Sequence, residues 1–238
     1  MDHIVNIAAY RFVSLSDLPT LRTSLREHAL AQNLKGTILL AHEGINLFLA
    51  GSRENMDNFL RFLRAMPAFA NLEIKESYSA SQPFGKLLVK LKREIISLGQ
   101  PDIDPSRDPA PRLSAGQLKA WLDEGREVVL LDTRNQFEIE HGSFVGALEL
   151  GLNNFRSFAN KIKQLDPALK EKPIVTFCTG GIRCEKAAPL MRKNGFEHVY
   201  QLDGGILKYF EECGTAHFNG NCYVFDERVA LNAELQPQ

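Results

Sequence analysis

The 238-residue sequence has no long apolar run and no excess of charge of either sign. No segment approaches the roughly 18 apolar residues that span a bilayer, which excludes a typical membrane helix. With 28 Lys and Arg against 29 Asp and Glu, bulk positive charge cannot drive binding to nucleic acid, although a local basic face can. The apolar stretch near the N-terminus follows no basic segment, so we expect no signal peptide and a cytoplasmic protein.

Cysteine is scarce, and its four positions, Cys178, Cys184, Cys213 and Cys222, all lie in the last third of the chain. This clustering favours thiol chemistry in a reducing compartment over a disulfide framework. Phosphate-binding and dinucleotide-binding glycine motifs are absent, and no histidine pair has the spacing of metal ligands. The sequence therefore predicts no metal and no organic cofactor; an iron site assembled in space from two histidines and a carboxylate is the less favoured alternative.

A proline-rich segment divides the chain. Residues 99–112 hold four of the 11 prolines and almost no apolar periodicity, which is typical of a linker. We therefore predict domains at residues 1–98 and 113–215, followed by a C-terminal extension at residues 216–238.

The first domain is predicted to alternate between strands and helices. The expected elements are a strand at Ile4–Ala9, a helix at Asp17–Gln32, strands at Thr37–Ala41 and Ile45–Ala50, a helix at Arg53–Met66, and strands at Leu72–Tyr78 and Leu87–Leu91. Ser16 and Ser52 are predicted to cap the two helices, and Leu25 and Leu30 to lie on the apolar face of the first. The order βαββαβ, with an additional strand, is typical of a ferredoxin-like α+β sandwich.

The second domain alternates more regularly. Strands are expected at Val128–Leu131, Pro173–Phe177 and His198–Leu202, and helices from a capping box at Ser114 to Leu122, at Phe155–Leu165, at Glu185–Lys193 and at Ile206–Glu212. This alternation predicts an α/β domain with a parallel sheet, in which ligands bind beyond the carboxyl ends of the strands.

The sharpest feature of the sequence is a loop between an apolar strand and a helix. It consists of Cys178, Thr179, Gly180, Gly181, Ile182 and Arg183. The two glycines permit a tight turn whose N–H groups converge on the sulfur, and the helix N-terminus and Arg183 add positive charge. These features favour a thiolate at Cys178 and an anion-binding loop. The less favoured alternative is a small buried cysteine ahead of a glycine turn.

Two neighbouring groups have more than one interpretation. Cys184 is either a resolving thiol for Cys178 or a small apolar residue on the first helical turn, and its spacing does not separate these roles. Asp132 and Arg134 are predicted to form a buried ion pair at a strand end, with orientation of the loop by Arg134 as the less favoured role.

Polar residues also gather on the predicted strands of the first domain. Lys86, Lys90 and Lys92 alternate with apolar residues and precede Arg93, so the lysines point outward while Leu87, Val89 and Leu91 face the core. A basic strand face can contact phosphates, but spacing alone favours a solvated edge strand protected against aggregation. His42, Glu43 and Asn46 surround Gly44 between two strands, which favours a turn over a ligand-facing element.

Several segments resemble the rhodanese domain. Leu130–Arg134 with Glu138, the loop Cys178–Arg183 and Leu202–Gly205 are similar to its first signature, its active-site loop and its closing signature. In rhodaneses the loop cysteine carries a persulfide during sulfur transfer.

A more specific resemblance covers almost the whole chain. The segments that carry it are His42–Asn46, Lys75–Ser77, Pro83-Phe84, Cys178–Lys186, Gly204–Tyr209 and Cys222–Val229. They are similar to the tRNA uridine hydroxylases, which combine an acylphosphatase-like domain with a rhodanese domain and make 5-hydroxyuridine at the wobble position. Two departures are Leu47-Phe48-Leu49 in place of a glycine-rich turn, and an end at Gln238 where many relatives continue into a cysteine-rich tail.

The resemblance implies an oxidoreductase with Cys178 as its essential residue and dioxygen as co-substrate. It also implies tRNA as the partner, bound through the anticodon arm by Lys86, Lys90, Lys92 and Arg93, and it makes His42, Glu43 and Asn46 substrate-facing. The alternatives are a sulfurtransferase that carries a Cys178 persulfide and a non-catalytic tRNA-binding or redox-sensing module.

Overall fold

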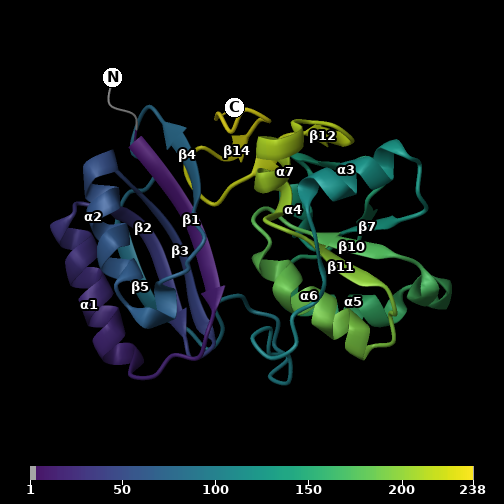
Figure 1. The fold of residues 1–238 in the computed structure, drawn as a ribbon, viewed down its shortest axis with the longest axis horizontal. Helices are drawn as coiled ribbons and strands as arrows, with labels where there is room; N and C mark the ends of the chain where they lie inside the picture. Colours follow the sequence, from purple (N-terminus) through teal and green to yellow (C-terminus); the bar gives the residue numbers. More distant parts are fainter. Residues whose placement is uncertain (1–3, 238) are drawn as a thin grey trace. The chain divides into compact units, whose positions relative to one another are not determined.

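The described chain, residues 4–237 of a computed structural model, divides into two units near the proline-rich segment (Figure 1). One unit contains the chain up to Ile96 together with Asp226–Arg228, and the other contains Ser97–Phe225 and the residues from Val229 onward. Each unit has its own five-stranded sheet and its own cluster of buried apolar side chains. No described helix combines the length and the apolar character that crossing a membrane requires.

The first unit is a ferredoxin-like sandwich, as the sequence predicts. Its elements are β1 (Ile4–Phe12), α1 (Leu18–Ala31), β2 (Lys35–Ala41), β3 (Gly44–Gly51), α2 (Arg53–Arg64), the short 3-10 helix η1 (Pro67–Phe69), β4 (Lys75–Ser79) and β5 (Leu87–Leu91). The sheet order is β4-β1-β3-β2-β5, with antiparallel pairs throughout except for β5, which pairs in parallel with β2. Both helices lie on one face of this sheet (Figure 1).

The caps and apolar faces of the two helices follow the sequence only in part. Ser52 caps α2 by accepting a hydrogen bond from the N–H of Asn55. The predicted cap of α1 is wrong: Asp17, and not Ser16, accepts the bond from the N–H of Thr20, and α1 begins one residue later than expected. The prediction that Leu30 lies on the apolar face of α1 is also wrong, because this residue is 45% exposed to solvent.

The second unit is an α/β domain with a parallel sheet. Its elements are β6 (Arg112–Leu113), α3 (Ala115–Asp123), β7 (Val129–Asp132), α4 (Gln136–Ile139), β8 (Gly142–Phe144), β9 (Leu148–Glu149), η2 (Phe155–Ser157), α5 (Phe158–Lys161), η3 (Ile162–Gln164), η4 (Pro167–Glu171), β10 (Ile174–Phe177), α6 (Ile182–Lys193), β11 (Val199–Leu202), α7 (Gly205–Cys213), β12 (Phe218–Gly220), β13 (Cys222–Tyr223) and β14 (Ala230–Leu231). The main sheet has the order β6-β11-β10-β7-β9, and all its pairs are parallel.

One predicted helix of the second unit is broken into short pieces. The segment predicted as a single helix, Phe155–Leu165, forms η2, α5 and η3 in succession. Phe155, Phe158 and Ile162 are nevertheless buried, so the apolar spacing of a helix is kept. None of the three pieces has a side-chain cap, and uncapped ends tighten into 3-10 turns that satisfy their own backbone groups.

Candidate active site

Cys178 lies at the carboxyl end of β10, the middle strand of the parallel sheet. The strand is fully buried, and the neighbouring strand β7 is tied to its end by Thr133, whose N–H and hydroxyl both donate to the carbonyl of Phe177. This is the edge of a parallel sheet where ligands usually bind. The Cys178 side chain has no exposed surface, so a substrate reaches the sulfur only if some of the surrounding protein moves.

The loop after Cys178 forms the amide turn that the glycines predict. Gly181 has φ +97°, a conformation that L side chains rarely adopt, and its N–H donates to the Cys178 sulfur at 3.1 Å. The first turn of α7 holds the other side of the loop, because the N–H groups of Ile206 and Leu207 donate to the carbonyls of Cys178 and Thr179. The sulfur is therefore buried but lies against backbone amide groups, as an anion would require.

Opposing effects determine the ionisation of Cys178. Burial raises the pKa of its thiol, but a hydrogen bond with Cys184, the charge of Arg183, and the backbone N–H groups of Arg183 and Gly181 together lower it well below the ordinary value of 9.0. Burial raises the pKa of the other three cysteines above the same value. Cys178 is thus the one cysteine of this chain that the structure favours as a thiolate.

The pH dependence of thiolate absorbance tests this ionisation. Because the pKa of Cys178 is lowered, its thiolate persists at neutral pH and is lost only when the pH falls through that lowered pKa. We expect the ultraviolet thiolate absorbance, taken as the difference between the protein and its Cys178→Ser variant, to titrate with a pKa well below the ordinary value of 9.0. A midpoint at or above that value would contradict the account.

Arg183 contributes less free charge than its sequence position suggests. Its guanidinium forms two 2.6 Å hydrogen bonds with the carboxylate of Glu138, and both side chains are buried. The predicted positive charge beside the sulfur is therefore largely compensated by Glu138. The sequence shows Glu138 only as part of a signature and does not predict its pairing with Arg183, since the two residues are 45 positions apart and belong to different helices, α4 and α6.

Cys184 and the Asp132–Arg134 pair are both buried in the second unit. Cys184 is a buried free thiol, and its sulfur lies 3.8 Å from the hydroxyl of Thr133. Burial, followed by the hydrogen bond and charge of Cys178, raises the pKa of Cys184, so it stays protonated and can donate to the thiolate. Its role as a resolving thiol remains a prediction. Asp132 and Arg134 form the expected ion pair, at 2.6 Å and with both side chains fully buried.

A substitution at Gly205 tests the close contact between α7 and the loop. Gly205 has φ +66°, and a Cβ there would lie 2.4 Å from the carbonyl oxygen of Cys178. We expect Gly205→Ala to lower the free energy of unfolding by more than the roughly 1–2 kcal/mol that backbone strain alone costs, because α7 must also shift. Gly125→Ala is the matched control, since Gly125 has the same φ of +66° and no neighbour within 4 Å. If urea denaturation gave the same loss of unfolding free energy for both variants, the contact between α7 and the loop would not contribute to stability.

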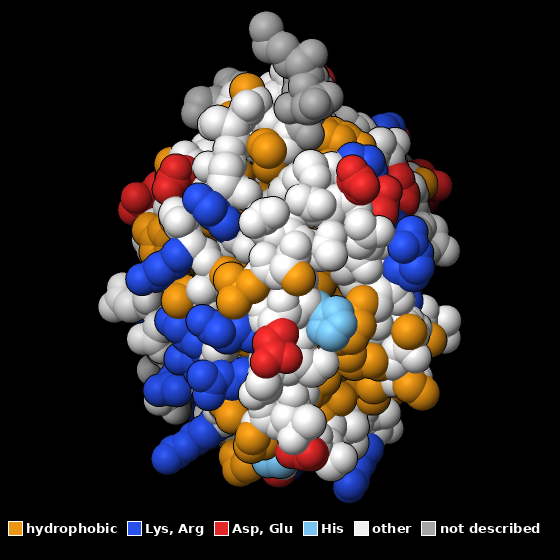
Figure 2. Space-filling model, turned by 90° about the vertical axis from the view of Figure 1, so that its left-hand side faces the viewer, with side chains coloured by type: hydrophobic (Ala, Val, Ile, Leu, Met, Phe, Trp, Pro, Cys, Tyr) orange, Lys and Arg blue, Asp and Glu red, His pale blue; other side chains and the backbone are white. Residues whose placement is uncertain are grey.

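The predicted basic residues of the first unit lie at a sheet edge. Lys86, Lys90, Lys92 and Arg93 are all exposed, and β5 is the outer strand next to β2. One part of the expected alternation is wrong: Leu91 is 39% exposed, because the edge of the sheet leaves it uncovered. Lys and Arg side chains gather on one flank of the helical side of this unit (Figure 2).

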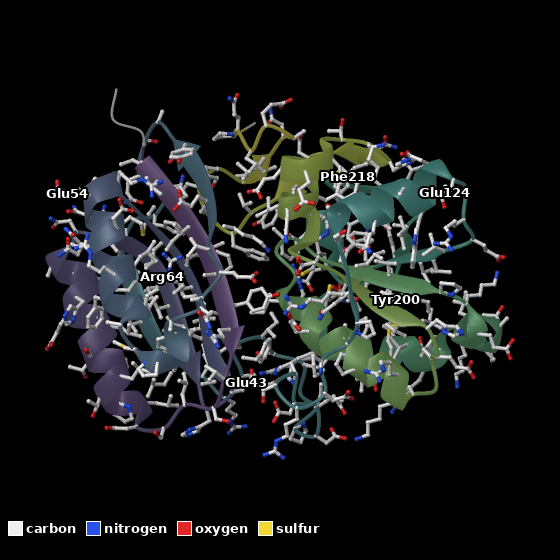
Figure 3. The ribbon with its side chains drawn as sticks, in the orientation of Figure 1. Glu43, Glu54, Arg64, Glu124, Tyr200 and Phe218 are labelled. Atoms are coloured by element: carbon white, nitrogen blue, oxygen red, sulfur yellow. The ribbon has the colours of Figure 1, made fainter. Side chains whose placement is uncertain are left out.

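The turn between β2 and β3 is held by contacts to backbone. The ring of His42 hydrogen-bonds the carbonyl of Leu15 at 2.9 Å. Glu43, labelled in Figure 3, accepts a 2.7 Å bond from the N–H of Ile95, and the amide of Asn46 donates to the carbonyl of the same residue. These contacts account for the polar residues as parts of a turn, and a role facing the substrate remains a prediction.

Two family models match the chain, one for each unit. A model described as UPF0176 acylphosphatase like domain matches residues 4–95, and a rhodanese-like domain matches residues 114–212. Among curated relatives, a protein of Bordetella petrii is 55% identical over all of this chain and 96% of its own length, and one of Bordetella parapertussis is 55% identical over all of both chains. Both are named tRNA uridine(34) hydroxylase. The chain belongs to the tRNA uridine(34) hydroxylase family.

Solved structures match less than half of this member of the tRNA uridine(34) hydroxylase family. The solution structure of a rhodanese-like domain from an Anabaena protein is 26% identical, covers 46% of this chain and 79% of that chain, and has a TM-score of 0.39.

Within residues 4–237, no group of three or more His, Cys, Asp and Glu side chains gathers as a metal site.

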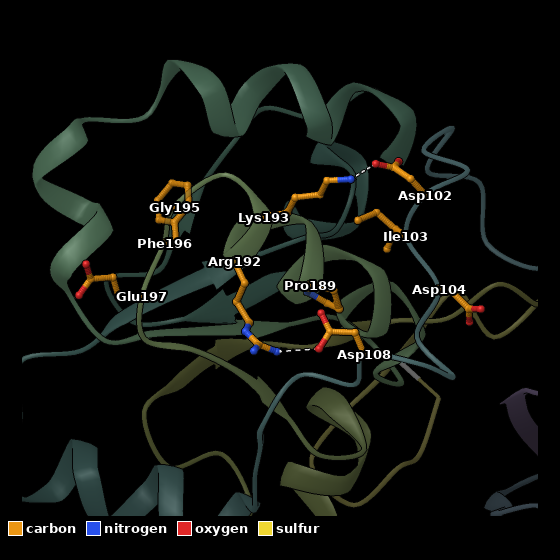
Figure 4. A pocket seen from close by; sticks show the side chains of 10 residues that line it. All are labelled: Asp102, Ile103, Asp104, Asp108, Pro189, Arg192, Lys193, Gly195, Phe196 and Glu197. Atoms are coloured by element: carbon orange, nitrogen blue, oxygen red, sulfur yellow. Dashed lines mark hydrogen bonds and ion pairs between the residues drawn. The ribbon is translucent and has the colours of Figure 1, made fainter.

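A separate cavity of about 540 Å³ lies at the opposite end of α6 from Cys178 (Figure 4). Ion pairs between α6 and the linker cross it, from Arg192 to Asp108 and from Lys193 to Asp102. Because a helix of this length spans roughly 18 Å, the cavity is remote from the loop. In this family member, Cys178 and Glu138 therefore do not line the cavity.

Proposed function

We propose that this protein hydroxylates carbon 5 of the wobble uridine of tRNA, with dioxygen as co-substrate and Cys178 as nucleophile. The observation that carries the proposal is a pairing of two facts. The chain is similar over its full length to proteins named tRNA uridine(34) hydroxylase, and its β10 strand ends at a cysteine bonded by a backbone amide. A lowered thiol pKa provides the nucleophile at neutral pH.

The reaction begins with attack on the uracil ring. The Cys178 thiolate forms a bond to carbon 6, and the electrons of the carbon 5–carbon 6 double bond move to carbon 5 as an enolate. The N–H groups of Gly181 and Arg183 hold the negative charge of the sulfur before attack and after its release. Cys184 holds its own proton and donates a hydrogen bond to the same sulfur.

The remaining steps balance with a thiol reductant. Carbon 5 bonds to dioxygen and, with one proton, becomes a hydroperoxide. A pair of thiol molecules then reduces the O–O bond, which leaves a hydroxyl group on carbon 5, a water molecule and one disulfide. Loss of the carbon 5 proton expels the Cys178 thiolate and restores the double bond. Uridine, dioxygen and a thiol pair thus give 5-hydroxyuridine, water and a disulfide.

In this proposal the first unit binds the anticodon arm. The exposed Lys86, Lys90, Lys92 and Arg93 contact its phosphates, and the affinity falls as salt rises because each contact releases counterions. The formal net charge of -1 means that such binding depends on a local face and not on the whole protein.

Mass spectrometry of tRNA nucleosides tests the proposed function. Cells that lack this protein should contain no 5-hydroxyuridine from this route, and the nucleoside should return when the protein is restored. Unchanged 5-hydroxyuridine would contradict the proposal. Turnover of thiosulfate through a Cys178 persulfide, without any change in the nucleoside, would support the sulfurtransferase alternative instead.

A further inference from the structure

Three aromatic side chains pack together in the second unit, on segments that contact the loop of Cys178. Phe137, from α4, packs edge-to-face on Tyr223 and Phe225, with ring centroids 5.2 Å and 6.5 Å away. Tyr223 and Phe225 also pack edge-to-face on each other, at 5.2 Å. We call these three residues the aromatic cluster. Its mutual contacts fix the orientation of each ring without covering them all.

The segment that carries Tyr223 and Phe225 is bonded to the loop of Cys178. The hydroxyl of Thr179 donates to the carbonyl of Tyr223 at 3.3 Å, and the guanidinium of Arg183 lies 6.0 Å from the centre of the Phe225 ring. Both partners are loop residues within five positions of Cys178. A group that stacks on the cluster therefore lies next to the segment that follows Cys178 in the sequence.

The aromatic cluster is unusually open to solvent for its composition. Phe137 is 43% exposed and Phe225 is 47% exposed, whereas Arg183 beside them is buried. Contiguous exposed rings next to a buried functional group are typical of a binding surface. No substrate as small as thiosulfate needs them, because an anion of that size binds to the loop amides alone.

Two of the three rings of the aromatic cluster come from outside the rhodanese-like match. Tyr223 and Phe225 lie beyond the rhodanese-like match, which ends at residue 212. The short hairpin of β13 and β14, together with a bond from the N–H of Val224 to the carbonyl of Val229, brings this segment back to the loop. A C-terminal segment thus supplies Tyr223 and Phe225 to the aromatic cluster, and α4 of the rhodanese-like part supplies Phe137.

We infer that Phe137 and Phe225 form a stacking platform for an unpaired base of the RNA substrate. This inference rests on the proposed function and specifies how the target loop of the RNA is held at Cys178. Aromatic side chains bind unpaired bases by stacking on their faces, and this mode suits single-stranded loops of RNA. The guanidinium of Arg183 lies over the Phe225 ring, 6.0 Å from its centre, which links the platform to the loop of Cys178.

Binding of a stem-loop RNA with uridine at the wobble position tests the platform. We expect Phe225→Ala to raise both the Kd and the KM for this RNA by roughly tenfold, within the range of one lost base stack. Phe137→Ala should have the same direction of effect. Phe225→Trp should keep the affinity, whereas Phe225→Leu, which keeps an apolar side chain but no ring face, should not. Val145→Ala is the matched control, because Val145 is 59% exposed in the same unit and has no ring.

An abasic scan of the same RNA identifies the stacked base. The loss caused by Phe225→Ala should disappear when one particular loop base is removed, and it should persist at the other positions. The inference is wrong if Phe225→Leu binds as tightly as the unsubstituted protein, or if the loss persists at every abasic position. It is also wrong if the Ala variant changes the thiolate absorbance of Cys178, since the rings would then only cover the loop.

Failure of the proposed function gives a different result from failure of the platform. If the unsubstituted protein binds the RNA but forms no 5-hydroxyuridine, the proposed reaction is wrong while the Kd values still test the platform. If the protein forms 5-hydroxyuridine and Phe225→Ala changes neither Kd nor KM, the reaction stands and the platform is wrong.

Discussion

Cys178→Ser is expected to lower the formation of 5-hydroxyuridine by roughly 10³-fold or more, because the covalent nucleophile is lost. The fold should remain, since a hydroxyl group replaces the sulfur in a buried position and can still accept the hydrogen bond from Gly181. The measurement is mass spectrometry of nucleosides after reaction of the purified full chain with a wobble-uridine stem-loop RNA, dioxygen and a thiol reductant.

Cys213→Ser is the matched control for this loss. Cys213 ends α7, is only partly buried and lies outside the loop, so its replacement should leave the product yield unchanged. The role of Cys178 would be refuted if Cys178→Ser retained the activity of the unsubstituted protein. Equal circular dichroism spectra and urea midpoints exclude unfolding as the cause of any loss.

Glu138→Ala is expected to lower the free energy of unfolding by about 3–5 kcal/mol, since it leaves the Arg183 charge buried without its partner. The two terminal nitrogens of Arg183 each donate a 2.6 Å hydrogen bond to the carboxylate of Glu138, and the buried Nε of Arg183 has no acceptor among the described residues. Without the carboxylate, the free-energy cost of burying the guanidinium charge is therefore no longer offset. Urea denaturation followed by circular dichroism measures the change.

Glu140→Ala provides a matched control from the C-cap of the same short helix, where the side chain is exposed. Its effect should lie within about 0.5 kcal/mol of zero, as for most surface substitutions. The double variant Glu138→Leu with Arg183→Met should regain most of the lost stability, because no unpaired charge is then buried. A loss as small as that of Glu140→Ala would show that the ion pair does not stabilise the loop.

Local patterns predicted the fold because they depend on neighbouring residues. The capping box at Ser114 and the apolar spacing of Met56 and Leu63 involve residues within one or two helical turns, and the structure confirms them. Ser16 and Asp17 are both good caps, so propensity alone could not choose between them. Leu30 shows the other kind of error: apolar periodicity does not reveal where a helix extends past its sheet.

In the candidate site, too, the local features could be predicted from the sequence and the tertiary contacts could not. The order of strand, cysteine, glycines and helix located the loop, because each part acts on its immediate neighbours. The partner of Arg183 and the aromatic cluster could not be predicted, since Glu138 and Phe225 approach the loop only through the tertiary fold. The sequence shows that Tyr223 and Phe225 lie close together, but their exposure is a property of the folded chain and could not be predicted from it.

Reaction under isotopically labelled dioxygen tests the central claim most directly. The full chain, a thiol reductant and a wobble-uridine stem-loop RNA should yield 5-hydroxyuridine that carries one labelled oxygen atom, and the Cys178→Ser variant should yield none. Product whose new oxygen comes from water, or equal labelled product from the Cys178→Ser variant, would contradict the account.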